Sequence, residues 1–181
     1  MNNSIKPNSF QAWLLAMRPE TLTGAAIPVL LGSALAYIFG KFQPVPALLC
    51  FLFAFLMQTD ANFINDLYDY LKGTDREDRL GPERACAQGW ITPAGMKRGI
   101  AVTTLLACCV GLGLLSYGGW GMIPVGLACI VFAFLYTAGP YPLAYHGWGD
   151  VLVLIFFGFV PVGCTFYVMA HSWNTAVFVV S

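Results

Sequence analysis

Long apolar stretches recur along the chain, and they constrain its fold more than any other feature of the sequence. Hydrophobic residues make up 58% of the 181 residues and charged residues only 10%, whereas about a quarter of the residues in an ordinary soluble domain are charged. The stretches are long enough for helices that cross a bilayer, which need roughly 17–25 residues each. The sequence therefore predicts an all-α, polytopic bundle of transmembrane helices, with residues 1–181 forming a single domain.

Five full spans and the start of a sixth are expected. The full spans are Leu22–Phe39, Val45–Tyr68, Arg98–Tyr117, Gly121–Ala138 and Asp150–Ala170. Residues 10–18 form an apolar segment that is too short to span, and we expect it to lie at the membrane interface as a helix. The final apolar run, Thr175–Val180, resembles a sixth span cut short. From this we expect the sequence to be a C-terminally truncated part of a longer protein.

Basic residues indicate which side of the bundle faces the cytoplasm. They gather before the first span and in the loop after the second: Lys6, Arg18, Lys72, Arg76, Arg79, Arg84, Lys97 and Arg98. The opposite side holds only Lys41. Because cytoplasmic loops carry an excess of Lys and Arg, the N-terminus and the loop of residues 70–97 are predicted to face the cytoplasm from the cell's inner membrane. The net charge of zero gives no argument for nucleic acid as a partner, and the oligomeric state is not indicated.

Acidic residues are concentrated at one place. Six of the nine fall between Asp66 and Glu83. Just before and within this cluster, a run of amides and carboxylates recurs at offsets that place it on one face of a helix: Gln58, Asn62, Asn65, Asp66 and Asp69. A polar stripe at membrane depth must face a cavity or the protein interior rather than lipid. Asp60 lies off this stripe; a helix–helix contact is one explanation for it, and it is assigned no role in the site.

This pattern predicts a site for magnesium and a diphosphate. Magnesium takes hard oxygen ligands, commonly one or two protein carboxylates together with phosphate oxygens and water. Asp66 and Asp69 are about 4.5 Å apart along a helix axis, which suits cations bridged by a diphosphate. The following basic residues, Lys72, Arg79 and Arg84, would contact the phosphate oxygens. An acidic stripe also occurs along transport pathways, but here the acids crowd one side, which favours a one-sided site.

Three strings carry a resemblance to a known family. The segment NDLYDYLKGTDREDRLGPERACAQG, which begins at Asn65, resembles the first aspartate-rich motif of the UbiA-type intramembrane prenyltransferases. It is similar in particular to the branch that acts on 1,4-dihydroxy-2-naphthoate. The strings MRPETL at Met17–Leu22 and YTAGPYPLAYHGWGD at Tyr136–Asp150 are similar to the same branch. The resemblance covers the chain from Trp13 to its end.

The resemblance implies a fold of eight or nine helices and a magnesium-dependent enzyme. Such enzymes bind a polyprenyl diphosphate through two Mg²⁺ ions, ionise it, and let the allylic cation attack an aromatic acceptor. In the naphthoate branch the acceptor also loses its carboxylate, and the product is demethylmenaquinone. Acceptors of the hydroxybenzoate, chlorophyllide or haem type are the nearest alternatives. Family members carry a second aspartate-rich motif after span six, which lies beyond the residues present here.

The candidate site residues follow from the stripe and the resemblance together. The metal ligands are predicted to be Asn62, Asp66, Asp69 and Asp75, and the last three are the candidate catalytic residues. The substrate contacts are predicted to be Asn65, Lys72, Arg79, Arg84 and Tyr141. The tyrosine is included because an aromatic ring face attracts a carbocation as it does other cations.

Overall fold

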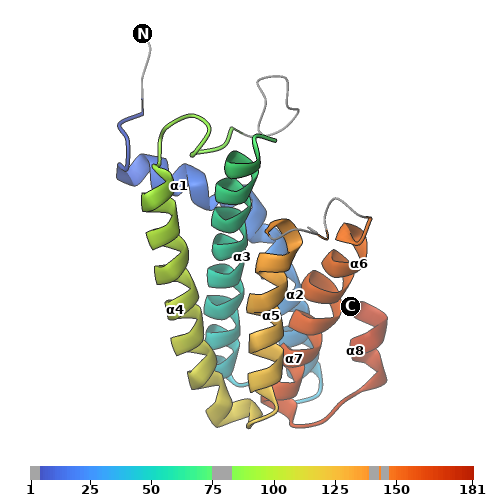
Figure 1. Ribbon diagram of the computed structural model, residues 1–181. Coiled ribbons are helices and arrows are strands. Elements are labelled where there is room, and N and C mark those ends of the chain that lie inside the picture. Colours follow the sequence, from blue (N-terminus) through green and yellow to red (C-terminus); the bar gives the residue numbers. More distant parts are fainter. Residues whose placement is uncertain (1–4, 75–82, 139–142, 144–146) are drawn as a thin grey trace.

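The computed structural model describes residues 5–74, 83–138, 143 and 147–181 of the chain (Figure 1). All regular elements within these ranges are helices, so the all-α prediction is confirmed. In chain order they are α1 (Phe10–Met17), α2 (Pro19–Ile38), α3 (Pro44–Lys72), α4 (Pro93–Gly118), α5 (Met122–Thr137), α6 (Gly149–Val153), the π-helical segment η2 (Leu154–Phe159), α7 (Val160–Ala170) and α8 (Thr175–Val180).

Each of the five predicted spans corresponds to a helix. Four helical stretches are long and apolar enough to cross a membrane: α2, α3, α4 and the continuous stretch Gly149–Ala170, which combines α6, η2 and α7. The fourth predicted span corresponds to α5, which is also apolar but has only 16 residues. The fold is therefore a multi-pass bundle of membrane helices.

The loop between α3 and α4 is shorter than the charged loop that the sequence predicts. We expected it over residues 70–97, but α3 continues to Lys72 and α4 already begins at Pro93. Helix α3 ends at Gly73, whose φ of +66° lies in the left-handed region that glycine adopts without strain. Helix α4 begins early because the Thr92 hydroxyl accepts a hydrogen bond from the Gly95 N–H at 3.1 Å, and Pro93 suits the first position of a helix.

One end of the bundle gathers the polar features. Helix α1 lies across the end at which α3 stops and α4 starts, and α5 also ends there (Figure 1). We call this the polar end. Six of the basic residues predicted on the cytoplasmic side belong to segments at this end: Lys6, Arg18, Lys72, Arg84, Lys97 and Arg98. Lys41, between α2 and α3, lies at the other end.

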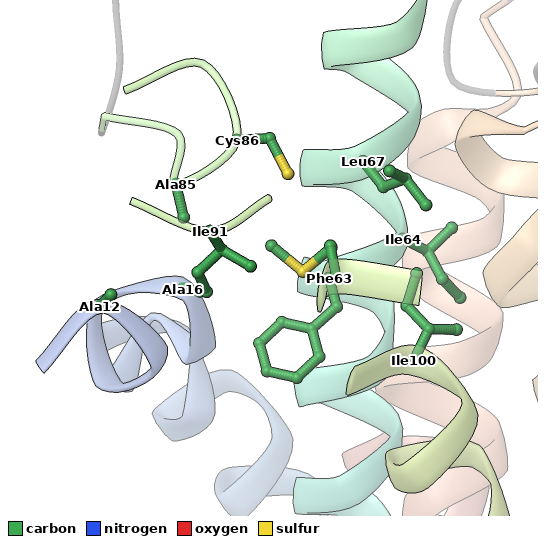
Figure 2. Close-up of a cluster of buried hydrophobic side chains, with 10 residues drawn as sticks. Ala12, Ala16, Phe63, Ile64, Leu67, Ala85, Cys86, Ile91 and Ile100 are labelled. Carbon is green, nitrogen blue, oxygen red and sulfur yellow. The ribbon is translucent and has the colours of Figure 1, made fainter. Parts of the chain in front are cut away.

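A buried apolar cluster fixes α1 to the polar end (Figure 2). Ala12 and Ala16 of α1 pack against α3 and the segment that leads into α4; the other buried members are Phe63, Ile64, Leu67, Ala85, Cys86, Ile91, Met96 and Ile100. The small side chains of α1 allow its backbone to approach α3 closely. A second cluster, around Val29, Val162 and Phe166, occupies the opposite end of the bundle. Residues 83–92, the described segment before α4, thus contribute the buried side chains of Ala85, Cys86 and Ile91 to the core.

The buried carboxylate of Asp60 joins α3 to α4. Its side chain is fully buried, and its two oxygens accept hydrogen bonds from the hydroxyl groups of Thr103 and Thr104. A carboxylate at membrane depth is costly unless its oxygens have partners. Asp60 therefore makes a helix–helix contact, on a different face of α3 from the predicted stripe.

The close approach of α2 and α7 depends on Gly32. A Cβ atom at this position would lie 2.6 Å from the carbonyl oxygen of Val162 and 2.8 Å from Cβ of Thr165. Because both neighbours belong to a packed helix, neither can move without separating the two helices. Gly24, earlier in α2, has open space where its Cβ would be.

Replacing Gly32 by Ala is expected to destabilise the bundle by about 1–3 kcal/mol, since it overpacks a tight helix contact. The matched change Gly24→Ala is expected to be neutral or to stabilise the protein by up to about 1 kcal/mol, through helix propensity. The measurement is the midpoint of thermal unfolding in detergent. Equal midpoints for Gly32→Ala and the unmodified protein would contradict this packing.

Candidate functional site

A cavity of about 340 Å³ opens between α2, α3, α5 and the helical stretch that includes η2 and α7. Its walls are mostly apolar, and α3 contributes most of its polar groups, through Gln58, Asn62 and Asn65. Cys50 of the same helix lines the far part of the cavity. Because Cys50 and Asn65 are fifteen residues apart, the cavity extends about 22 Å along α3. It is a long apolar space with amide groups towards the polar end.

The apolar wall includes both helix segments that proline disturbs. Pro28 lies inside α2, and Pro161 is the second residue of α7, two positions after the end of η2. A proline within a helix has no N–H to donate and its ring crowds the carbonyl four residues earlier, so the local hydrogen bonding must change. The π-helical segment η2 is the change seen before Pro161. Pro28, Pro161 and Phe157 all line the cavity.

Asn62 joins α3 to the junction of α1 and α2. Its Nδ2 donates to the Met17 carbonyl and to Thr21 Oγ1, both at 2.8 Å. The Thr21 hydroxyl donates to the Arg18 carbonyl at 2.9 Å, so it accepts from Asn62, and also from Gln58 Nε2 at 3.2 Å. These bonds fix which end of the Asn62 amide faces the α1–α2 junction.

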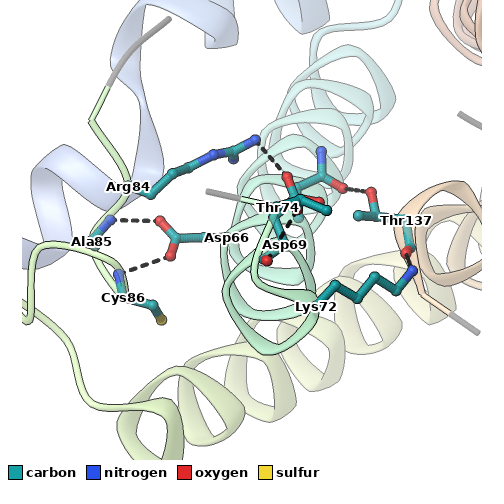
Figure 3. A network of polar contacts seen from close by, with 9 residues as sticks. Asp66, Asp69, Lys72, Thr74, Arg84, Ala85, Cys86 and Thr137 are labelled. Atoms are coloured by element: carbon teal, nitrogen blue, oxygen red, sulfur yellow. Dashed lines mark hydrogen bonds and ion pairs between the residues drawn. The ribbon is translucent and has the colours of Figure 1, made fainter. Parts of the chain in front are cut away.

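Asn65 and Lys72 join α3 to the end of α5. The Thr137 hydroxyl donates to Asn65 Oδ1, and Lys72 Nζ donates to the Thr137 carbonyl (Figure 3). Thr137 is the last residue of α5, where carbonyl groups have no partner within the helix. The lysine therefore satisfies one of these carbonyls and places its positive charge at the favourable end of the helix dipole.

Asp69 and Arg84 form a buried ion pair. Arg84 Nη2 lies 2.8 Å from Asp69 Oδ2, and their side chains are only 6% and 10% exposed, respectively. The backbone carbonyl of Asp69 accepts from the Thr74 hydroxyl at 3.1 Å, next to the turn at Gly73. Two predicted site residues, one from α3 and one from the segment before α4, are thus brought together at the polar end.

Asp66 points in a different direction. Its carboxylate oxygens accept hydrogen bonds from the backbone N–H groups of Ala85 and Cys86, at 2.8 and 2.9 Å (Figure 3). It is 1% exposed and does not line the cavity. Successive residues of a helix differ by about 100°, so Asp66 faces the segment before α4 while Asn65 faces the cavity. The predicted polar stripe is therefore divided between the cavity and this segment.

The side-chain oxygen atoms at the polar end are of the chemical type that binds a hard cation. They are amide and carboxylate oxygens, the ligands that magnesium prefers. Among the residues described, no three His, Cys, Asp or Glu side chains are gathered so as to hold a metal ion. Asp75, Arg79 and Tyr141 lie outside the described residues, so their predicted roles remain predictions.

Two threonines of the site were not predicted from the sequence. Thr21 orients the Asn62 amide, and Thr137 contacts both Asn65 and Lys72. A signal for both was present, because Thr21 belongs to the string MRPETL and Thr137 to the string YTAGPYP. The resemblance that these strings carry does not indicate which side chains they contact.

Comparison with known proteins agrees with the resemblance. The model of the UbiA prenyltransferase family matches residues 25–181. The curated relatives include proteins named 1,4-dihydroxy-2-naphthoate octaprenyltransferase. The Escherichia coli protein is 40% identical over 168 residues, which cover 90% of this chain and 54% of the relative. The Haemophilus influenzae protein is 35% identical, covering 88% and 54%, and the Mycobacterium tuberculosis protein is 35% identical, covering 90% and 55%.

The chain spans about half the length of the curated relatives that it matches. The family match, in contrast, extends over most of the chain and includes α3, α5 and every residue that lines the cavity. On this ground the chain belongs to the UbiA prenyltransferase family.

Proposed function

We propose that this chain binds a polyprenyl diphosphate and takes part in transferring its prenyl group to 1,4-dihydroxy-2-naphthoate, with loss of the acceptor's carboxylate, to give demethylmenaquinone. The observation that carries this proposal is the long apolar cavity with amide groups at one end and an acid–base cluster beside them. A prenyl diphosphate has the same division, since an apolar chain is joined to a highly charged head. The names of the relatives support the naphthoate acceptor.

Magnesium is the proposed cofactor. The set predicted from the sequence is Asn62, Asp66, Asp69 and Asp75. Asp69 is the member best supported by the structure, because its carboxylate lies at the polar end and already pairs with a cation, the Arg84 guanidinium. Bound magnesium would neutralise the diphosphate and stabilise it as a leaving group. Asp66 instead accepts backbone N–H groups with both of its carboxylate oxygens.

Basic residues of the chain would hold the phosphate oxygens. Arg84 can form paired hydrogen bonds to them and Lys72 a single charged contact. Both side chains belong to the polar end, next to Asp69 and Thr137, respectively. The apolar walls would receive the prenyl chain and exclude water from the allylic cation, which water would otherwise capture. Tyr136 lines the cavity, and its ring face could stabilise that cation.

We also propose that the polar end faces the cytoplasm from the cell's inner membrane. The basic residues of the described segments gather at this end, and only Lys41 lies at the other. This is the asymmetry that the positive-inside rule associates with the cytoplasmic side. Water-soluble acceptor and released diphosphate would then exchange with the cytoplasm.

The acceptor can be tested directly. Membranes that contain the protein, incubated with labelled octaprenyl diphosphate, Mg²⁺ and 1,4-dihydroxy-2-naphthoate, are expected to form a labelled product that has lost the carboxylate. Product identity is checked by chromatography and mass spectrometry. Parallel incubations with hydroxybenzoate serve as the control. Prenylation of hydroxybenzoate alone would refute the proposed acceptor.

The metal assignment predicts a specific defect in Asp69→Asn. Loss of one carboxylate charge should raise the Mg²⁺ concentration needed for half-maximal activity and lower the rate by about 10²-fold, as removal of one electrostatic contact to the reacting group does elsewhere. Glu20→Gln, which removes an exposed carboxylate of α2, is the matched control and should behave like the unmodified protein. An unchanged Mg²⁺ requirement in Asp69→Asn would count against the assignment.

A further inference from the structure

The contacts of Asp66 suggest a task other than metal binding. Its carboxylate accepts hydrogen bonds from the N–H groups of Ala85 and Cys86, which lie at the start of a short turn. In this turn the Gln88 N–H donates to the Arg84 carbonyl and the Gly89 N–H donates to the Cys86 carbonyl. The first N–H groups of such a turn have no partner within it. Here they are also buried, because Ala85 is 2% and Cys86 4% exposed. The Asp66 carboxylate supplies the acceptors that water cannot provide at this place.

The same segment is tied to α1 at its other end. The N–H groups of Trp90 and Ile91 donate to the Ala85 carbonyl at 2.9 and 3.1 Å, and the Trp90 carbonyl accepts from the Asn8 N–H at 2.7 Å. Ala85 and Ile91 belong to the apolar cluster around α1. The segment is therefore held between α3 and the N-terminal part of the chain.

Arg84 immediately precedes the two N–H groups, and its guanidinium reaches Asp69 at 2.8 Å. Asp66 and Asp69 are one helical turn apart on α3. Asp66 thus binds the backbone of this segment, and Asp69 binds the Arg84 side chain of the same segment. The position of Arg84 depends on both.

We propose that Asp66 is a positioning residue that fixes the backbone at Ala85 and Cys86, so that the Arg84 guanidinium is held at the polar end in advance of the diphosphate. The diphosphate part of this statement rests on the proposed function. In this arrangement Asp66 is not a metal ligand, because both of its carboxylate oxygens already accept backbone N–H groups of the segment before α4. A ligand role would require oxygens that already accept one backbone N–H each to share their remaining lone pairs with the metal.

The positioning role can be tested without measuring activity. Asp66→Asn keeps the size of the side chain but replaces one acceptor oxygen by an NH₂ group, which cannot accept. The Cys86 thiol should then react with N-ethylmaleimide about tenfold faster in detergent-solubilised protein, because the segment opens locally. Peptide mass spectrometry identifies the modified cysteine. Asp69→Asn, which leaves both backbone hydrogen bonds in place, is the matched control and should keep Cys86 protected.

Cys50 reports on the rest of the bundle, because it is buried in the second apolar cluster. Exposure of Cys86 with continued protection of Cys50 supports the proposal. Protection of both cysteines in Asp66→Asn would overturn it. Exposure of both to the same extent would also overturn it, since Asp66 would then support the whole fold and not this segment.

Kinetics separate positioning from metal binding. Asp66→Asn and Arg84→Ala should each raise KM for octaprenyl diphosphate, and the double variant should be no worse than the poorer single one, because both changes remove the same contact. The half-saturating Mg²⁺ concentration should stay unchanged in Asp66→Asn while it rises in Asp69→Asn. A rise in both would identify Asp66 as a ligand and overturn the proposal. If the unmodified protein transferred no prenyl group, the proposed function would fail while the Cys86 result would still stand.

Discussion

Polar side chains on α3 lie at membrane depth, and the need to satisfy them determines where the other helices sit. Water is scarce at this depth, so an amide or carboxylate must find its partner within the protein. The contacts run outward from α3 in several directions: Asp60 binds α4, Asn62 binds the α1–α2 junction, and Asn65 binds the end of α5. Asp66 and Asp69 bind the segment before α4. Helix α3 therefore contacts the neighbouring helices through its polar side chains and also contributes most of the candidate site residues.

This double use explains why structural and chemical roles are hard to separate on α3. Side chains that differ by only one or two positions face different neighbours, as Asn65 and Asp66 do. The amide side chains of Asn62 and Asn65 line the cavity, whereas the carboxylates of Asp66 and Asp69 contact the segment before α4. At the polar end the positive groups of Arg84 and Lys72 are already bound to oxygen atoms of the protein, the Asp69 carboxylate and the Thr137 carbonyl, respectively.

The parts of the fold that depend on local sequence could be predicted. The lengths of the apolar stretches predicted the spans, because this signal lies in the residues concerned. The end of α3 at Gly73 was not predicted, since the loop was expected from residue 70. The predicted third span begins at Arg98, whereas α4 begins at Pro93. Thr92 and Pro93 form a recognised helix start, but the basic residues that follow are typical of a charged loop.

The partners of the site residues could not be predicted in the same way. Periodicity placed Asn62, Asp66 and Asp69 within one arc of α3, but that arc is wide enough to meet two different neighbours. Thr21 and Thr137 contact α3 across 41 and 72 residues of sequence, respectively, and spacing carries no information about contacts of that range. The roles of Asp75, Arg79 and Tyr141 remain predictions because these residues lie outside the described part of the chain.

The hydrogen bonds between Asn62 and the α1–α2 junction have a consequence for biogenesis. During synthesis α2 leaves the ribosome before α3, so the Met17 carbonyl and the Thr21 hydroxyl meet the Asn62 amide only when the third helix enters the bilayer. Insertion of α2 and its final placement are therefore separate events, in keeping with helices that insert first and associate afterwards. The α1–α2 junction therefore gains its hydrogen bonds to Asn62 only after both of these helices have been translated.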